Sequence, residues 1–174
     1  VENGFGTLYT VSQAEAQVGT KAFASLQTAI DAAQDGETVT LLTDIVLDAQ
    51  AGTERTLYPQ FTISAKKLTL DMQGHKISYS EESRTKDYGE ATLLTLSIDK
   101  GSDVTITGNG TIDTELGSNQ AYGINILDGS NLTINNGTFY GAMTAVQVQK
   151  GGLVINDGTF LMAPTCKEQV PQYA

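Results

Sequence analysis

A short segment recurs along the chain and, more than any other feature, limits the folds open to it. Its first and third residues are apolar, and its second is usually threonine. The four strong copies are Leu68-Thr-Leu-Asp71, Val104-Thr-Ile-Thr107, Leu132-Thr-Ile-Asn135 and Leu153-Val-Ile-Asn156, and a weaker copy is Val39-Thr-Leu-Leu42. Apolar residues at every second position indicate a β-strand with one buried and one wet face. The repeat therefore predicts at least five similar strands.

Each strong copy belongs to a larger unit that also contains a corner and two further apolar stretches. A glycine follows each copy (Gly74, Gly110, Gly137, Gly158), and then another apolar residue (Ile77, Ile112, Phe139, Phe160). Strand-like stretches precede the copies at 61–64, 94–98, 124–127 and 144–149. Successive copies begin 29, 36, 28 and 21 residues apart. These intervals indicate one basic turn that is enlarged in places by inserted loops.

Winding the chain so that the copies stack predicts an all-β fold, a right-handed parallel β-helix of about five rungs. Two apolar columns would line its interior, Leu68/Val104/Leu132/Leu153 and Leu70/Ile106/Ile134/Ile155, with Thr69, Thr105 and Thr133 pointing outward. Asp71, Thr107, Asn135 and Asn156 would form a partial side-chain ladder at the corner. A β-sandwich also has short alternating strands, but it gives no reason for the same unit to recur in register.

An amphipathic helix is predicted just before the first strand. Ser25 is a suitable N-cap, the apolar stripe runs from Leu26 to Ala33, and Gly36 is expected to end the helix. Such a helix would cap the first rung. We expect one domain over residues 1–174, with 1–36 as the N-terminal segment and capping helix, 37–160 as the rungs and 161–174 as a C-terminal tail or cap.

The segments 23–44 and 68–77 also resemble a known family. They are similar to the opening and to a "D-x-x-G-x-x-I" corner of pectin-lyase-like β-helix modules in bacterial cell-surface and secreted proteins. The resemblance covers roughly residues 10–160 and implies the fold more specifically than the function, because this fold carries lyases, hydrolases, adhesins and stalks.

Composition bears on partners and location. Acidic residues outnumber basic ones 20 to 10, which gives a net charge of −10. That charge disfavours nucleic acid and anionic membranes as partners, and no apolar run is long enough for membrane insertion. The single cysteine, Cys166, cannot form an internal disulfide. Together with the resemblance, this predicts an extracellular or cell-surface protein whose export signal is not part of this chain.

A catalytic constellation is not recognisable in the sequence. A lyase needs a calcium-binding carboxylate cluster beside a basic residue, and the two arginines, Arg55 and Arg84, lie in inserted loops. Glu81, Glu82 and Asp87 are the nearest carboxylates to Arg84 along the chain, in a stretch that is typical of solvated loops. His75 is the only histidine, so a histidine-based metal site or triad cannot be assembled. We expect no cofactor, no metal and no enzymatic activity.

Tyrosines supply the candidate binding residues. The loops 48–60, 78–90 and 113–121 leave the stacked strands at related points, so they could gather on one side. Their side chains would either line a groove that stacks against sugar rings or pack the loops onto the strands. The candidate residues are Tyr58, Tyr79, Arg84, Tyr88, Tyr122 and Tyr140.

These observations predict a non-catalytic surface module that acts as an adhesive, ligand-binding or spacer domain. Its partner would be a polysaccharide or a host or bacterial surface protein. Two alternatives remain open: a polysaccharide lyase or glycoside hydrolase, or a remnant of one, and a structural subunit that self-associates end to end. The tail after Phe160 has no helical pattern, so it would cover the open end irregularly unless another subunit does so.

Overall fold

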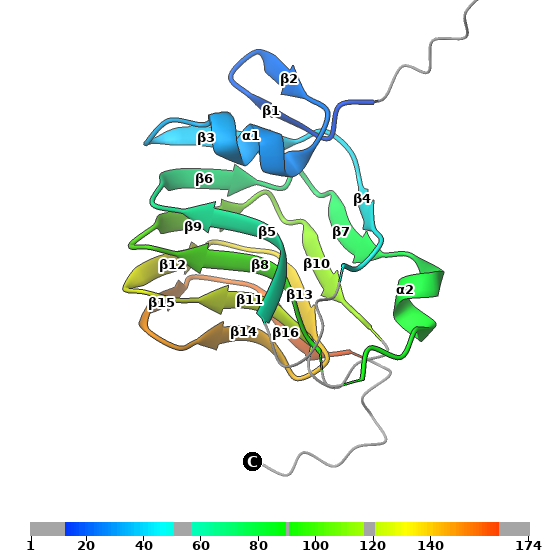
Figure 1. The fold of residues 1–174 in the computed structure, drawn as a ribbon. Helices are drawn as coiled ribbons and strands as arrows, with labels where there is room; N and C mark the ends of the chain where they lie inside the picture. Colours follow the sequence, from blue (N-terminus) through cyan, green and yellow to red (C-terminus); the bar gives the residue numbers. More distant parts are fainter. Residues whose placement is uncertain (1–12, 51–56, 90, 117–120, 164–174) are drawn as a thin grey trace, which may run out of the picture.

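The structure is a computed structural model that describes residues 13–50, 57–89, 91–116 and 121–163. Most of these residues form strands in three sheets, here called A, B and C (Figure 1). Sheet A has the order β2 (Lys21–Phe23), β1 (Ala16–Val18), β3 (Glu37–Leu41), β6 (Lys67–Asp71), β9 (Asp103–Thr107), β12 (Ser130–Ile134) and β15 (Gly151–Ile155). Sheet B has the order β4 (Ile45–Leu47), β7 (Lys76–Tyr79), β10 (Thr111–Thr114), β13 (Thr138–Gly141) and β16 (Thr159–Met162). Sheet C has the order β5 (Leu57–Ser64), β8 (Thr92–Asp99), β11 (Ala121–Ile126) and β14 (Thr144–Val148).

From β3 onward the chain passes through sheets A, B and C in turn and then begins again. Within each sheet, a strand pairs in parallel with the corresponding strand of the next passage. Figure 1 shows the strands of successive passages lying one above another, as in β6, β9, β12 and β15. The prediction of an all-β chain with parallel strands is therefore confirmed.

The predicted register of the four strong repeats is also confirmed. Leu68 pairs with Val104, Val104 with Leu132 and Leu132 with Leu153, and the second apolar column follows the same ladder. The apolar residues after the glycines form a third column in sheet B, in which the rings of Phe139 and Phe160 stack with centroids 5.3 Å apart. The weak fifth copy is displaced by two residues, because Val39 pairs with Leu70 instead of Leu68. A shift of two keeps the same side chains inside.

Burial follows the predicted columns until the last passage. Leu70, Ile106 and Ile134 are 1%, 0% and 0% exposed, whereas Ile155 is 49% exposed. The prediction that Ile155 is buried is wrong, because β15 is the last strand of sheet A and no described strand pairs beyond it. The threonines between the apolar positions (Thr69, Thr105 and Thr133) are half-buried.

The corner ladder forms only in part. Asn156 donates its side-chain N–H to Oδ1 of Asn135 at 2.8 Å, as stacked amides should. Asp71 and Thr107 are ladder partners in sheet A, but the Asp71 carboxylate accepts a hydrogen bond from the backbone N–H of Gln73 at 3.2 Å. Position 110 at the corner requires glycine for steric reasons, since a Cβ there would lie 2.5 Å from both Met72 Cβ and the carbonyl oxygen of His75.

The first helix, α1 (Leu26–Ala32), lies beside sheets A and C at the N-terminal end of the stack (Figure 1). Ser25 is its N-cap, as predicted, but the helix ends at Ala32, before the expected stop at Gly36. The side-chain amide of Gln27 bonds to both the N–H and the carbonyl of Thr62 in β5, at 2.9 and 3.0 Å. It thereby occupies the edge of sheet C as a neighbouring strand would. The sequence pattern did not predict the hairpin β1–β2, whose strand β1 pairs antiparallel with β3 in sheet A.

At the other end, β16 runs to Met162, so the expectation that regular structure ends at Phe160 is wrong by two residues. Ala163 is fully buried and donates its backbone N–H to Gly141 O. Cys166 and the rest of the predicted tail lie outside the described residues.

Candidate functional site

The three sheets are joined by corners of very different length. Connections from sheet A to B (72–75, 108–110, 135–137, 156–158) and from C to A (65–66, 100–102, 127–129, 149–150) are uniformly short. Connections from sheet B to C span 48–56, 80–91, 115–120 and 142–143. The prediction that inserted loops leave related points of successive turns is therefore confirmed, and the B-to-C corner holds nearly all the variation.

The inserted segments meet in a second apolar cluster outside the main core. It contains Ala49, Tyr79, Tyr88, Ala91, Leu93, Leu116, Ala121 and Ala142. The short helix α2 (Glu81–Thr85), with Ser80 as N-cap, joins this cluster to the neighbouring segment, because Ser83 Oγ accepts the backbone N–H of Ala49 at 2.9 Å. The corner is thus a packed layer built on the strands.

Two of the candidate binding tyrosines are part of that layer. Tyr79 and Tyr88 are both buried, so the prediction that Tyr79 faces a ligand groove is wrong, whereas Tyr88 also contributes to the polar pocket described below. The Tyr79 hydroxyl bonds to Thr95 at 2.8 Å, and Thr95 bonds on to Thr114 at 2.7 Å. Burial raises the pKa of the Tyr79 hydroxyl above its ordinary value. These rings pack the loops down, which was the other interpretation of their positions.

The remaining candidates do not form one surface. Tyr58 in β5 is 41% exposed, while Tyr122 in β11 and Tyr140 in β13 are half-buried. Tyr122 and Tyr58 belong to sheet C but to different rows of it, since Tyr58 pairs with Leu93 and Tyr122 with Leu94. Tyr140 is in sheet B, beside Asp113. A continuous row of tyrosines is therefore not present among these residues.

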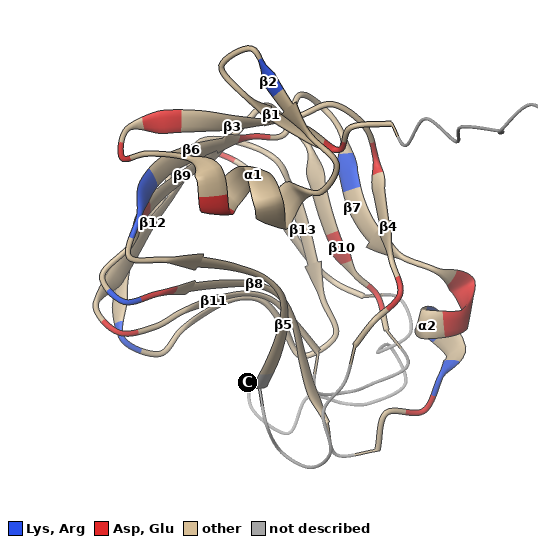
Figure 2. Ribbon diagram, turned by 45° about the horizontal axis from the view of Figure 1, so that its top comes forward, with Lys and Arg blue, Asp and Glu red and all other residues tan. Residues whose placement is uncertain are grey.

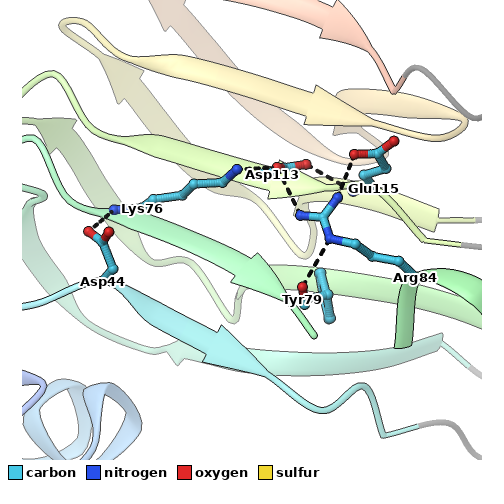
Figure 3. A network of polar contacts seen from close by, with 6 residues as sticks. All are labelled: Asp44, Lys76, Tyr79, Arg84, Asp113 and Glu115. Atoms are coloured by element: carbon cyan, nitrogen blue, oxygen red, sulfur yellow. Dashed lines mark hydrogen bonds and ion pairs between the residues drawn. The ribbon is translucent and has the colours of Figure 1, made fainter. Parts of the chain in front are cut away.

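Arg84 lies in an ionic network between α2 and sheet B (Figure 3). Its Nη2 bonds to Asp113 at 3.0 Å, its Nη1 pairs with Glu115, and its Nε donates to the carbonyl of Tyr79 at 3.0 Å. Lys76 Nζ approaches the same Asp113 oxygen at 2.5 Å. The Arg84 side chain is mostly buried, at 18% exposed, and its ion pairs anchor α2 to sheet B.

The electrostatics of Asp113 agree with this structural role. Burial acts to raise the pKa of the Asp113 carboxyl group, but the hydrogen bonds and charges of Lys76 and Arg84 outweigh it and hold the pKa below its ordinary value. A similar but exposed pair lies nearby, where Asp44 accepts the backbone N–H of Lys76 at 3.0 Å and contacts His75 Nδ1 at 3.2 Å. His75 is half-buried at its corner.

A polar pocket opens where α2 meets the segment after β4. Its volume is about 530 Å³, and it is lined by Asp48, Ala49, Gln50, Glu82, Ser83, Lys86, Asp87 and Tyr88. Figure 2 shows α2 projecting from the sheets, with acidic residues along it and a basic one near its C-terminal end. Only Tyr88 of this set was among the candidate binding residues. The sequence did contain a signal for the lining residues of α2, because Ser80-Glu-Glu is typical of a helix N-terminus and here follows a strand.

Among the described residues, no three histidine, cysteine, aspartate or glutamate side chains gather in a way that could hold a metal ion. In the same part of the chain, neither helix is long and apolar enough to cross a membrane. Comparison with protein-family models, with curated proteins and with solved structures finds no match to this chain.

Proposed function

We propose that this chain is a short right-handed parallel β-helix, capped by α1, that serves as a non-catalytic extracellular module and binds carbohydrate at its B-to-C corner. Regular passage through three parallel sheets supports the β-helix, and crossovers between parallel strands are right-handed in nearly all proteins. The contacts of α1 with strands of sheets A and C, and the two bonds from Gln27 to β5, support its role as a cap.

The observation that carries the binding role is the restriction of length variation to one corner. Short, constant turns are all that winding requires, so the segments 48–56 and 80–91 are longer than the fold needs. Residues 48–50 and 82–88 of these segments supply the lining of the polar pocket, whose carboxylates, amide and ammonium groups are the kind that bond to sugar hydroxyls. Such a pocket on a rigid scaffold binds with little loss of backbone entropy.

The charge of the pocket narrows the class of sugar. Asp48, Glu82 and Asp87 give it three carboxylates against one ammonium group, that of Lys86. Because the whole chain also carries a net charge of −10, uronic acid polymers would be repelled. Neutral sugars or amino sugars fit this surface better. The engagement of Arg84 in ion pairs supports a non-catalytic role, since a lyase of the expected type needs a free basic group beside the scissile sugar.

A glycan array at physiological calcium, run beside a lyase assay on polygalacturonate, tests the proposal. We expect selective retention of neutral or amino-sugar glycans and no cleavage. Glu82→Gln should weaken binding about tenfold, because it removes a carboxylate from the pocket wall. Glu81→Gln is the matched control: it makes the same change of charge one residue away, on the same helix but outside the pocket. Equal loss in both variants would point to a non-specific charge effect, and cleavage of polygalacturonate would replace the binding role with the lyase role.

A further inference from the structure

The two ends of the stacked sheets differ in how they are closed. At the N-terminal end, the hairpin β1–β2 covers the edge of sheet A and Gln27 occupies the edge of sheet C. At the opposite end lie β14, β15 and β16, and no described strand pairs beyond them. We call these three edge strands and the groove between them the C-terminal face.

The C-terminal face is apolar and lacks the usual protection of a sheet edge. Its groove has a volume of about 300 Å³, lined by Gly141, Met143, Thr144, Ala145, Val146, Leu153, Ile155, Phe160, Leu161 and Met162. None of the residues in β14, β15 or β16 is charged, and none is proline. Exposed edges in soluble proteins usually carry lysine, proline or a bulge, which prevent pairing with another chain. These features are typical of a sheet edge that another strand covers.

At the spacing of the last two passages, the sequence after Ala163 does not continue the apolar pattern of sheet C. The residue that would follow Val146 in its column of sheet C can be found by adding the length of the last passage. The sheet A repeat from Leu132 to Leu153 leads to Lys167, and the sheet C repeat from Ile124 to Val146 leads to Glu168. Either residue would bring an unpaired charge into a column that is apolar in every described passage. A strand from another molecule is the better partner.

We propose that a second copy of this chain covers the C-terminal face, in a twofold dimer whose β15 strands pair antiparallel. Stacking in a head-to-tail filament is disfavoured, because the hairpin and Gln27 occupy the edges of sheets A and C at the other end. A twofold contact uses the same face on both copies and closes at two.

The backbone of β15 has the geometry for this pairing. Asn156 donates its N–H to β12 and Lys150 accepts from Gly129, so both residues face the preceding passage. Because hydrogen-bonding directions alternate along a strand, Gly151, Leu153 and Ile155 direct their N–H and carbonyl groups away from β12. An antiparallel copy centred on Leu153 meets these groups with the same three residues. Ile155 then lies opposite Gly151, where there is no side chain to clash.

The charges at the rim agree with the same register. Lys150 precedes β15 and Asp157 follows it, and both are exposed. Pairing centred on Leu153 places Lys150 of each copy beside Asn156 and Asp157 of the other. Each dimer thus gains two complementary contacts at its rim, while the centre of the interface is apolar.

Sedimentation equilibrium of the 174-residue chain tests the proposal. We expect a monomer–dimer equilibrium that strengthens with salt, since two copies of net charge −10 repel each other outside an apolar contact. Ile155→Lys should raise the dissociation constant at least tenfold, because the dimer would bury a charge that the monomer leaves in water. Val46→Lys is the control, since Val46 is an exposed valine, 65% accessible, in β4 of the first passage. Both variants should keep the wild-type circular dichroism spectrum.

Charge reversal tests the register. Lys150→Glu and Asp157→Lys should each weaken the dimer severalfold, and the double variant should recover most of the loss. Failure of the double variant to recover would refute the antiparallel register. A strictly monomeric chain, or assemblies that grow beyond two copies, would refute the dimer. If deleting residues 164–174 converts a monomer into a dimer, then that segment covers the face in the intact chain and the proposal is wrong.

Discussion

Two isoleucines of one ladder offer a direct test of how the packed interior ends. Ile134 and Ile155 are adjacent partners in sheet A, but Ile134 is fully buried and Ile155 is about half exposed. Ile134→Ala removes a side chain surrounded on all sides, and such truncations cost about 2–5 kcal/mol, part from lost transfer free energy and part from the cavity. Ile155→Ala loses about half the transfer term and leaves an open notch, so about 1 kcal/mol is expected.

Urea denaturation followed by circular dichroism measures both losses. The protein should be dilute enough to be monomeric, so that contacts between copies do not contribute to the stability loss measured for Ile155→Ala. We expect the two variants to differ by about 2 kcal/mol in unfolding free energy, with unchanged dependence on urea. If the two losses are equal and large, the last passage is as tightly packed as the earlier ones, and the open C-terminal face does not exist in solution.

Three further substitutions examine the cap, the corner and the ionic network. Gln27→Ala should cost about 1–3 kcal/mol and accelerate amide exchange in β5, whereas Gln34→Ala, in the exposed turn after α1, should change stability little. Tyr79→Phe should cost about 1–2 kcal/mol in thermal or urea unfolding, because it leaves the buried Thr95 hydroxyl without that partner. Folding lowers the pKa of Asp113, so its ion pairs stabilise the protein fully above the unfolded pKa of about 3.9 and less as the pH falls below it. Asp113→Asn should therefore lower stability at pH 7. It should also reduce the loss of stability on acidification, as thermal melts recorded between neutral and acidic pH would show.

The sheets were predictable because each strand carries its own pattern. The alternation in Leu68–Leu70, repeated in Val104–Ile106 and Leu132–Ile134, specifies both which face is buried and which residues stack, since all copies must share one interior. The register of the weak copy was harder to predict. Its strand, Glu37–Leu41, has only two apolar residues, Val39 and Leu41, so two registers two residues apart satisfy the same alternation.

The corner was predicted less well because its side chains are placed by contacts between segments distant in sequence. The burial of Tyr79 had a usable signal, since Tyr79 follows Ile77 by two residues in one strand and so shares its face. Tyr88 had none, because its burial depends on Ala49 and Leu116 from two other insertions. The pairing of Arg84 with Asp113 likewise requires sheet B to bring adjacent passages together.

The pocket and the C-terminal face use different parts of the molecule. The pocket residues belong to the connections of the first two passages, and none of them lines the groove of the last passage. A dimer through the C-terminal face would leave both pockets open. Two linked sites bind a polymer with repeated epitopes more tightly than a single short sugar, because the second contact becomes intramolecular.

If both proposals hold, Ile155→Lys should weaken binding to an immobilised polysaccharide by tenfold or more and leave binding of a short oligosaccharide in solution unchanged, as surface plasmon resonance and calorimetry would show. Equal weakening in both assays would mean that Ile155 affects the pocket itself, and the separation of the two surfaces would be wrong.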